Sequence, residues 1–240
     1  MVEKGIVRIG HRGAAGHAPE NTIAALHKGI ALGVDFVEFD VQRSQDGRLI
    51  VMHDPLVDRT TNGTGLISQM TWEELRSLDA GDGEGVPSLE DALAAVNGQV
   101  GVMLEAKAPG VGLAMHRAVQ EIRFAGPVIY ASFLHAEILA IRRADPRART
   151  MALLEGVPIA GAAFAGEAGA TLVGLAIDFA TAEFVAALYD AGAAVWVYTV
   201  NDPRLIEQAI ELGVEGIISD FPERVPKTRS GRDDNDSRTC

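Results

Sequence analysis

The sequence predicts an α/β fold, a (β/α)₈ barrel with a small insertion after its second strand. Three observations predict it. The chain has 240 residues, a length at which a barrel of alternating strands and helices forms one domain. Eight short runs of apolar and β-branched residues alternate with Ala-rich amphipathic segments. Glycines recur where such a helix would end before the next strand, at Gly33, Gly169, Gly192 and Gly213.

The expected strands are short and apolar, and they cover residues 6–10, 35–41, 100–106, 127–131, 150–154, 171–175, 194–200 and 215–219. The expected helices are amphipathic, and they cover residues 19–31, 89–96, 113–123, 136–143, 158–168, 182–190 and 203–212. Start signals support several of these helices, namely PENT from Pro19, the capping pair Ser88 and Asp91, Thr181, and Asp202 followed by Pro203.

The alternation breaks between Val41 and Pro87. The stretch SQDGRLIVMHD predicts a hairpin that turns at Asp46 and Gly47. The polar residues that follow predict one helix, which begins at Thr71. An insertion at this point lies on the C-terminal face of a barrel, where active sites are built. We expect one domain over residues 1–226, with the insertion at about 54–87 and a charged, disordered tail over 227–240.

Composition limits the partners and the compartment. The net charge of -12 and the pI near 4.9 argue against nucleic acid or an anionic membrane surface as a partner. The only cysteine, Cys240, is the last residue, so no disulfide within the chain is expected. The sequence contains neither the apolar core of a signal peptide nor an apolar run long enough for a membrane span. These features predict a cytoplasmic protein.

The second expected strand, DFVEFDV, carries two carboxylates on one face. Val37, Phe39 and Val41 alternate with Glu38 and Asp40. In a barrel the apolar set faces the helices, so both carboxylates face the barrel axis. Two carboxylates about 7 Å apart along one strand repel each other in a partly dry interior unless a cation lies between them.

The third expected strand, within VMLEAK, places Glu105 and Lys107 inward in the same way. Neighbouring strands lie about 4.8 Å apart, so Glu105 would adjoin Glu38 and Asp40. Three converging oxygen donors predict a hard dication, Mg²⁺ or Ca²⁺. The alternative is that these acids only pair with Lys107 and Arg12, which would leave surplus negative charge buried.

Two histidines lie next to this acidic cluster. His11 ends the first strand, and His53 lies where the hairpin returns. Neither has a second His or Cys at zinc spacing, so we interpret both as proton-transfer groups. The remaining histidines lie in loops and helices and are interpreted as structural: His17, His27, His116 and His135.

Arg12 directly follows His11, and Lys107 shares a face with Glu105. Fixed positive groups beside a metal suit a phosphate diester, because negative charge grows on its non-bridging oxygens in the transition state. The alternative for Arg12 is a salt bridge to Glu20 or Asp40.

Motifs in chain order resemble the glycerophosphodiester phosphodiesterase family: HRG at 11–13, PENT at 19–22, GVDFVEFDV at 33–41, DGRLIVMHD at 46–54, RTTNGTG at 59–65, PSLEDAL at 87–93, LEAK at 104–107 and GIISDFP at 216–222. The resemblance implies a TIM barrel with a small insertion after the second strand. It also implies hydrolysis of glycerophosphodiesters to glycerol 3-phosphate and an alcohol, with one divalent cation.

The resemblance also implies roles for individual residues. His11 and His53 would be the acid/base pair. The metal ligands would be Glu38, Asp40 and Glu105. Arg12 and Lys107 would hold the phosphate. Aromatic residues would line the glycerol pocket, namely Phe133, Trp196 and Tyr198. The family usually reads Trp-Thr-Val-Asn where this chain has Tyr198 to Asn201, with Trp196 two positions earlier on the same face. Barrel packing is the alternative role for either ring.

Several questions stay open at this level. One histidine would deprotonate the nucleophile, which is either water or the substrate's own glycerol hydroxyl, and the other would protonate the departing alcohol. An alternative is a phospholipase D-like lyase that stops at a cyclic phosphate, because the site also resembles that of the related spider sphingomyelinases D. Those proteins are secreted and disulfide-bearing, and this sequence shows neither feature. A non-catalytic barrel that binds a phosphorylated ligand is the third reading. The alcohol group preferred, Mg²⁺ against Ca²⁺ and the oligomeric state are not determined by the sequence.

Overall fold

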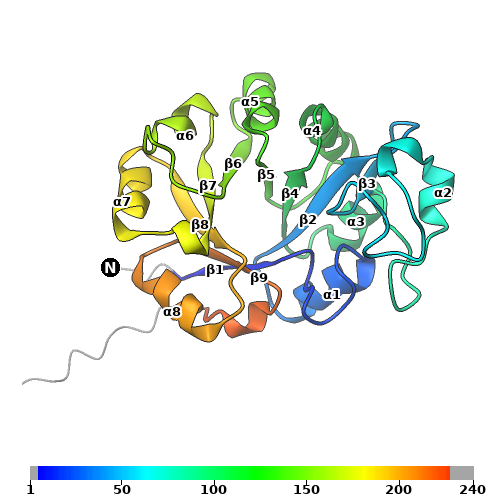
Figure 1. Cartoon of the computed structure of the whole chain (residues 1–240), viewed down its shortest axis with the longest axis horizontal. Coiled ribbons are helices and arrows are strands. Elements are labelled where there is room, and N and C mark those ends of the chain that lie inside the picture. The colour runs from blue at the N-terminus through cyan, green and yellow to red at the C-terminus, as the bar shows by residue number, and fades with distance from the viewer. Residues whose placement is uncertain (1–4, 228–240) are drawn as a thin grey trace, which may run out of the picture.

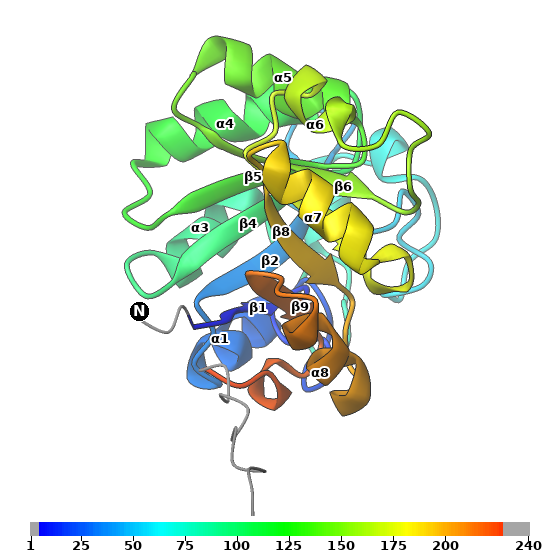
Figure 2. The ribbon, with the colours of Figure 1, turned by 90° about the vertical axis from the view of Figure 1, so that its left-hand side faces the viewer.

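The computed structural model describes residues 5–227, and within this range eight parallel strands form a closed barrel. Around the ring the strands follow the order β1-β9-β8-β7-β6-β5-β4-β2, and the pairing of β1 with β2 closes it. Figures 1 and 2 show the helices around the outside of the strands, with β1 beside β9. The predicted (β/α)₈ barrel is confirmed.

The barrel strands are β1 (Val7–Gly10), β2 (Phe36–Arg43), β4 (Gly101–Ala106), β5 (Val128–Ser132), β6 (Arg149–Leu154), β7 (Leu172–Ala176), β8 (Ala194–Tyr198) and β9 (Gly216–Ser219). The helices of the outer shell are α1 (Ile23–Ala31), α3 (Leu89–Val96), α4 (Val111–Ile122), α5 (His135–Ala144), α6 (Ala163–Glu167), α7 (Ala182–Asp190) and α8 (Pro203–Glu211). Short 3₁₀ turns lie between these elements and after the last strand: η1 (Ile67–Gln69), η2 (Ile177–Phe179) and η3 (Pro222–Arg224).

The strands separate two apolar cores. The outward residues of β2, among them Val37 and Phe39, are fully buried under the helical shell. The inward residues fill the barrel interior, where the rings of Phe36 and Trp196 meet edge to face with centroids 5.5 Å apart. Each buried side chain of this size stabilises the fold by roughly 1.5–3 kcal/mol. The polar inward positions of β2 and β4 therefore lie above a packed apolar floor.

Two helices begin later than the sequence predicts. The helix expected from residue 19 begins at Ile23, because Thr22 is its N-cap and Asn21 has a left-handed backbone with φ +60°. The helix expected from residue 158 covers only Ala163–Glu167, because Gly161 takes a left-handed turn with φ +61° before it.

The insertion after β2 begins as the predicted hairpin. Strand β3 (Leu49–Val51) pairs antiparallel with the end of β2, and the turn places Gly47 at φ +89°. The helix α2 (Trp72–Arg76) begins with the expected capping box between Thr71 and Glu74. A small core of its own stabilises this segment, formed by Ile50, Met52, Val57, Ile67, Leu75, Ala80 and Val86.

Two sequence expectations concern the ends of the chain and the membrane. The predicted tail, residues 227–240, lies outside the described residues except for Lys227. Across residues 5–227, no helix combines the length and the apolar character that crossing a membrane would require.

Candidate active site

Three carboxylates converge at the mouth of the barrel. The parallel pairing of β2 with β4 sets Asp40 opposite Glu105, and Glu38 lies two residues earlier on the same face. Glu38, Asp40 and Glu105 are only 2%, 1% and 8% exposed, and one oxygen from each lies within 4.8 Å of the others. Within residues 5–227 this is the only group of three acidic, His or Cys side chains arranged closely enough to hold a metal.

The electrostatics of this acidic cluster are those of a cation site. Burial, followed by the charges of Asp40 and Glu105, raises the pKa of Glu38 well above its usual value. Burial, followed by the charge of Asp40, raises the pKa of Glu105 to about 7, although Lys107 opposes the shift. Among the described residues, no group donates a hydrogen bond to Glu38 Oε1, which is buried. An all-oxygen donor set with an unpaired buried oxygen fits a hard dication.

Hydrogen bonds from the loop after β1 orient two of these carboxylates. The backbone N–H of Arg12 donates to Glu38 Oε2 at 2.7 Å. The Asn21 amide donates to Asp40 Oδ2 at 2.9 Å, and its oxygen accepts from the Asp40 backbone N–H at 3.2 Å. Sequence reasoning did not single out Asn21. Its place inside the PENT motif, between a glycine-rich loop and a helix, is the signal that could have pointed to it.

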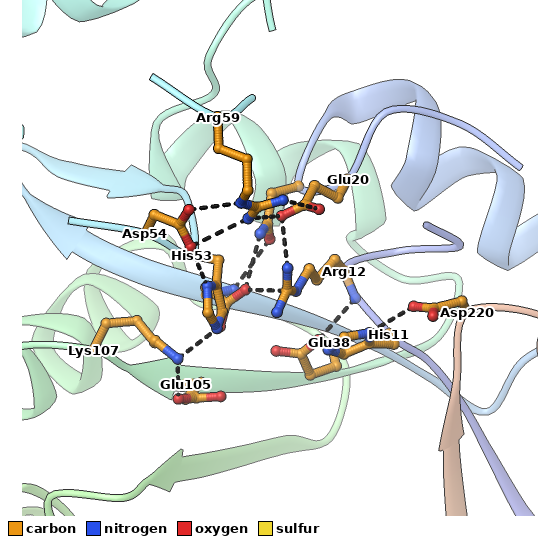
Figure 3. A network of polar contacts seen from close by, with 12 residues as sticks. His11, Arg12, Glu20, Glu38, His53, Asp54, Arg59, Glu105, Lys107 and Asp220 are labelled. Atoms are coloured by element: carbon orange, nitrogen blue, oxygen red, sulfur yellow. Dashed lines mark hydrogen bonds and ion pairs between the residues drawn. The ribbon is translucent and has the colours of Figure 1, made fainter. Parts of the chain in front are cut away.

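The two cations expected at the site lie beside the carboxylates (Figure 3). Arg12 Nη1 donates to Glu20 Oε1 at 2.7 Å, and its Nε lies 3.4 Å from Asp40 Oδ2. Lys107 Nζ donates to Glu105 Oε1 at 2.7 Å and lies 3.6 Å from Asp40 Oδ1. The ion pairs considered as alternatives are thus present. They do not reach Glu38 Oε1, so negative charge remains for a metal to neutralise.

His11 is held by residues at the ends of the barrel strands. Its Nδ1 lies 2.7 Å from Asp220 Oδ1, and because a carboxylate only accepts, Nδ1 carries the proton. Asn201 donates to the other oxygen of Asp220 at 2.6 Å. Burial alone would raise the pKa of Asp220, but the hydrogen bond from His11 and then that from Asn201 hold it below its usual value. Asp220, in the motif GIISDFP, was not among the predicted site residues.

His53 is held by its neighbour in sequence. Its Nδ1 donates to Asp54 Oδ1 at 2.6 Å, and its backbone carbonyl accepts from the Gln42 amide at 3.0 Å. Hydrogen bonds, first from Arg59 and then from His53, hold the pKa of Asp54 well below its usual value. Both histidines therefore have Nδ1 tied to a carboxylate, and Nε2 is the ring nitrogen left for proton transfer. Sequence reasoning missed Asp54 as well.

A cavity at the barrel mouth adjoins the carboxylates. It is lined by His11, Glu38, Met103, Glu105, Phe133, Leu153, Tyr198 and Ile218. Phe133 and Tyr198 form one wall, with ring centroids 5.9 Å apart, and Lys107 Nζ lies 5.8 Å from the centre of the Phe133 ring. The Tyr198 hydroxyl donates to the carbonyl of Leu154 at 3.0 Å. A small polyol beside the carboxylates would have an aromatic wall on this side.

Trp196 lies deeper than Tyr198. It is 2% exposed, it packs against Phe36, and it does not line the mouth cavity. The structure therefore favours the packing alternative for Trp196. Trp196 and Tyr198 are two residues apart on β8, so both rings point inward but at different depths along the barrel axis.

Three of the other histidines have structural partners. His17 lies 3.1 Å from Glu223, and His116 lies 3.1 Å from the Tyr130 hydroxyl. His135 donates to the carbonyl of Leu153 at 2.9 Å.

Comparisons with known proteins agree with this geometry. The sequence profile described as the glycerophosphoryl diester phosphodiesterase family matches residues 11–224. The glycerophosphodiester phosphodiesterase of Caldanaerobacter subterraneus subsp. tengcongensis is 33% identical over 231 residues, which cover 90% of this chain and 94% of that protein.

Solved structures are similar over the same extent. The Oleispira antarctica phosphodiesterase, in complex with the product sn-glycerol-3-phosphate, superimposes with a TM-score of 0.84 at 28% identity, covering 90% of this chain and 94% of that one. The glycerophosphodiester phosphodiesterase of Agrobacterium tumefaciens gives a TM-score of 0.78 at 30% identity, covering 90% and 97%. The matched stretch includes the acidic cluster and both histidines.

Proposed function

Because this chain belongs to the glycerophosphoryl diester phosphodiesterase family, we propose that it hydrolyses glycerophosphodiesters to glycerol 3-phosphate and an alcohol. The observation that carries the proposal is the cluster of three buried carboxylates, with two cations and two Asp-anchored histidines at the same rim. The names of the relatives and the product bound to the Oleispira antarctica phosphodiesterase support the substrate class.

One divalent cation, Mg²⁺ or Ca²⁺, would be held by Glu38, Asp40 and Glu105. Bound there, a dication polarises a phosphoryl oxygen and lowers the pKa of an oxygen nucleophile. The unpaired Glu38 Oε1 and the raised pKa values of Glu38 and Glu105 support this assignment, because burial and then the neighbouring carboxylates disfavour the charged forms, and a dication would offset that cost.

Arg12 and Lys107 bind the phosphate group in this proposal. Each already contacts a carboxylate that fixes its position, Glu20 for Arg12 and Glu105 for Lys107. Positive groups held in place before the reaction stabilise the charge that develops on the non-bridging oxygens, with little reorganisation. Phe133 and Tyr198 line the glycerol side of the cavity.

His11 and His53 transfer protons through Nε2. One removes the proton of the nucleophile and must have Nε2 free, and the other protonates the departing alcohol and must carry a proton on Nε2, so Nδ1 has to keep its own proton in both rings. The carboxylates of Asp220 and Asp54 hold that proton by accepting from Nδ1. The same residues serve direct attack by water and attack by a glycerol hydroxyl through a cyclic phosphate.

The test is release of glycerol 3-phosphate from glycerophosphodiesters that differ in the alcohol, measured with a coupled dehydrogenase with and without EDTA. We expect release that EDTA abolishes and added Mg²⁺ or Ca²⁺ restores. Absence of metal-dependent release from every substrate would favour a barrel that only binds phosphorylated ligands. A cyclic phosphate as the final product, detected by phosphorus NMR, would favour the lyase. Elemental measurement on the purified protein identifies the metal.

A further inference from the structure

We propose that Arg59, in the insertion, is a positioning residue for both sides of the site: it holds His53 through Asp54 and Arg12 through Glu20. This inference rests on the proposed function, because it assigns the effect of Arg59 to the turnover of that reaction. It gives the insertion a part in catalysis.

The guanidinium of Arg59 makes a two-pronged contact with each of two carboxylates. On Asp54, Nε donates to Oδ2 at 2.6 Å and Nη2 donates to Oδ1 at 3.2 Å. On Glu20, Nη1 donates to Oε2 at 2.8 Å and Nη2 donates to Oε1 at 2.7 Å. Figure 3 shows Arg59 between these two acids. A planar fork that engages two carboxylates at once fixes the plane and the position of both.

Each of the two carboxylates also contacts a residue assigned to the reaction. Asp54 Oδ1, which Arg59 holds, accepts from His53 Nδ1 at 2.6 Å. Glu20 Oε1, which Arg59 also holds, accepts from Arg12 Nη1 at 2.7 Å. The result is one continuous chain of charge-assisted hydrogen bonds, from His53 through Asp54, Arg59 and Glu20 to Arg12. A displacement of Arg59 would therefore shift both His53, the proton carrier, and Arg12, which binds the phosphate.

The chain of hydrogen bonds also joins two parts of the molecule. Glu20 lies in the loop between β1 and α1, whereas Asp54 and Arg59 lie at the start of the insertion. The insertion has its own small core, so its interior packing does not by itself set its position on the barrel. Arg59 is one polar link across this junction, and the hydrogen bond from the Ala24 backbone N–H to Glu84 is another.

A role in stability alone does not account for this arrangement. The Arg59 side chain is 47% exposed, and ion pairs with that much solvent access contribute little to folding stability. Its hydrogen bonds instead end on groups that touch His53 and Arg12. Arg76 provides the contrast: it is also in the insertion and 57% exposed, and it pairs with Glu73 at 3.6 Å within helix α2. That ion pair does not involve a residue assigned to the reaction.

The experiment compares Arg59→Gln and Arg59→Lys with the matched control Arg76→Gln, at saturating metal, by release of glycerol 3-phosphate. We expect Arg59→Gln to lower kcat by about 10- to 100-fold, since a misplacement of about 1 Å can cost that much. We expect KM to rise because Arg12 loses its orientation. Arg59→Lys keeps the charge but not the fork, so it should recover only part of kcat. Arg76→Gln should match the wild-type protein, and all three variants should keep the wild-type Tm.

Double variants separate positioning from a general loss of structure. If Arg59 acts through His53, Arg59→Gln should change kcat little further in a His53→Ala background. If it acts through Arg12, the rise in KM should disappear in an Arg12→Ala background. Wild-type kcat and KM in Arg59→Gln would overturn the proposal, as would full additivity in both backgrounds. Should Arg59→Gln fail to fold, Arg59→Lys decides, and wild-type kinetics in that variant overturn the proposal.

A structural readout keeps this inference distinct from the proposed function. If the wild-type protein hydrolyses no glycerophosphodiester, the proposed function fails, and nitrogen-15 NMR of the histidine rings then decides the position of His53. We expect an Nδ1-protonated ring in the wild-type protein and a mixture of tautomers in Arg59→Gln. An identical His53 spectrum in the two proteins would overturn the role of Arg59.

Discussion

The two histidines at the rim have the same local arrangement but different structural supports. His11 directly follows β1, and its partners Asp220 and Asn201 follow β9 and β8, so the barrel alone supports it. His53 lies at the start of the insertion, and its partner Asp54 is the next residue. One half of the site is therefore set by strand register, whereas the other half depends on how the insertion is docked.

The difference extends to charge. Asp220 contacts a neutral amide, Asn201, and is half-buried. Asp54 contacts the cation Arg59 and is about equally exposed. The carboxylate that orients His11 is therefore held by an uncharged amide, whereas the carboxylate that orients His53 is held by a cation that also binds Glu20. Mobility of the insertion would therefore affect one proton carrier and leave the other in place.

The largest effect is expected at the acidic cluster, which both halves of the site share. Glu38→Gln removes the ligand with the unpaired oxygen, so we expect loss of metal binding and turnover below detection. Without metal, the variant should unfold at the same temperature as the metal-free wild type or at a higher one, because a buried charge is gone. Calorimetric metal titration and thermal unfolding measure both. Wild-type metal affinity in this variant would contradict the assignment of Glu38.

The next largest effects are those of the two proton carriers. His11→Ala and His53→Ala should each lower kcat by about 10²- to 10⁴-fold, the usual contribution of a general acid or base. Both side chains lie at the rim, so circular dichroism and Tm should match the wild type. Activity retained in either variant would refute the pairing of these histidines. Unequal losses of kcat would show which of the two histidines contributes more to turnover.

The partner carboxylates distinguish the two supports. Asp220→Asn and Asp54→Asn should each lower kcat by about 10- to 100-fold, because the anchored tautomer is lost. Hydrogen exchange should separate them: Asp54→Asn accelerates exchange over the insertion at 54–87, and Asp220→Asn does not. Equal exchange in both variants would show that the insertion does not depend on the Asp54 ion pair.

A smaller effect is expected at Asn21, which orients Asp40 from the barrel side. Asn21→Ala should weaken metal affinity by about 10-fold, as loss of a group that orients a ligand usually does. At saturating metal, kcat should recover toward the wild-type value. The measurement is a metal titration of activity, and an unchanged titration would remove Asn21 from the site.

The smallest effect is the pH dependence of the metal-free protein. The pKa of Glu105 is raised from 4.5 to about 7, so the folded protein binds more protons there than the unfolded chain does between these values. The free energy of unfolding should therefore fall as pH rises through this window, and added metal should reverse the fall. Thermal unfolding in EDTA across this window measures it, and Glu105→Gln is the control that should reduce the slope, while Glu38, whose pKa is also raised, contributes the rest. A flat wild-type profile would contradict the raised pKa.

Much of the site could be read from the sequence, because its pattern is local. Strand alternation has a period of two, so FVEFDV alone places Glu38 and Asp40 opposite the apolar residues. The alternation of strands and helices makes β2 and β4 parallel neighbours, which adds Glu105. The positions of His11 and His53 at the strand ends then place both histidines at the mouth.

The partners of these residues are what only the tertiary structure decided. Asp220 is 209 residues from His11, and Asn21 reaches Asp40 only because its backbone is left-handed and the helix begins after it. The contact of Trp196 with Phe36 of β2 likewise depends on how the strands are staggered in the closed barrel, which no single strand encodes. The direction in which a side chain points follows from periodicity within one element, whereas its contacts depend on the register between elements and on loop paths, and these are fixed only when the whole barrel closes.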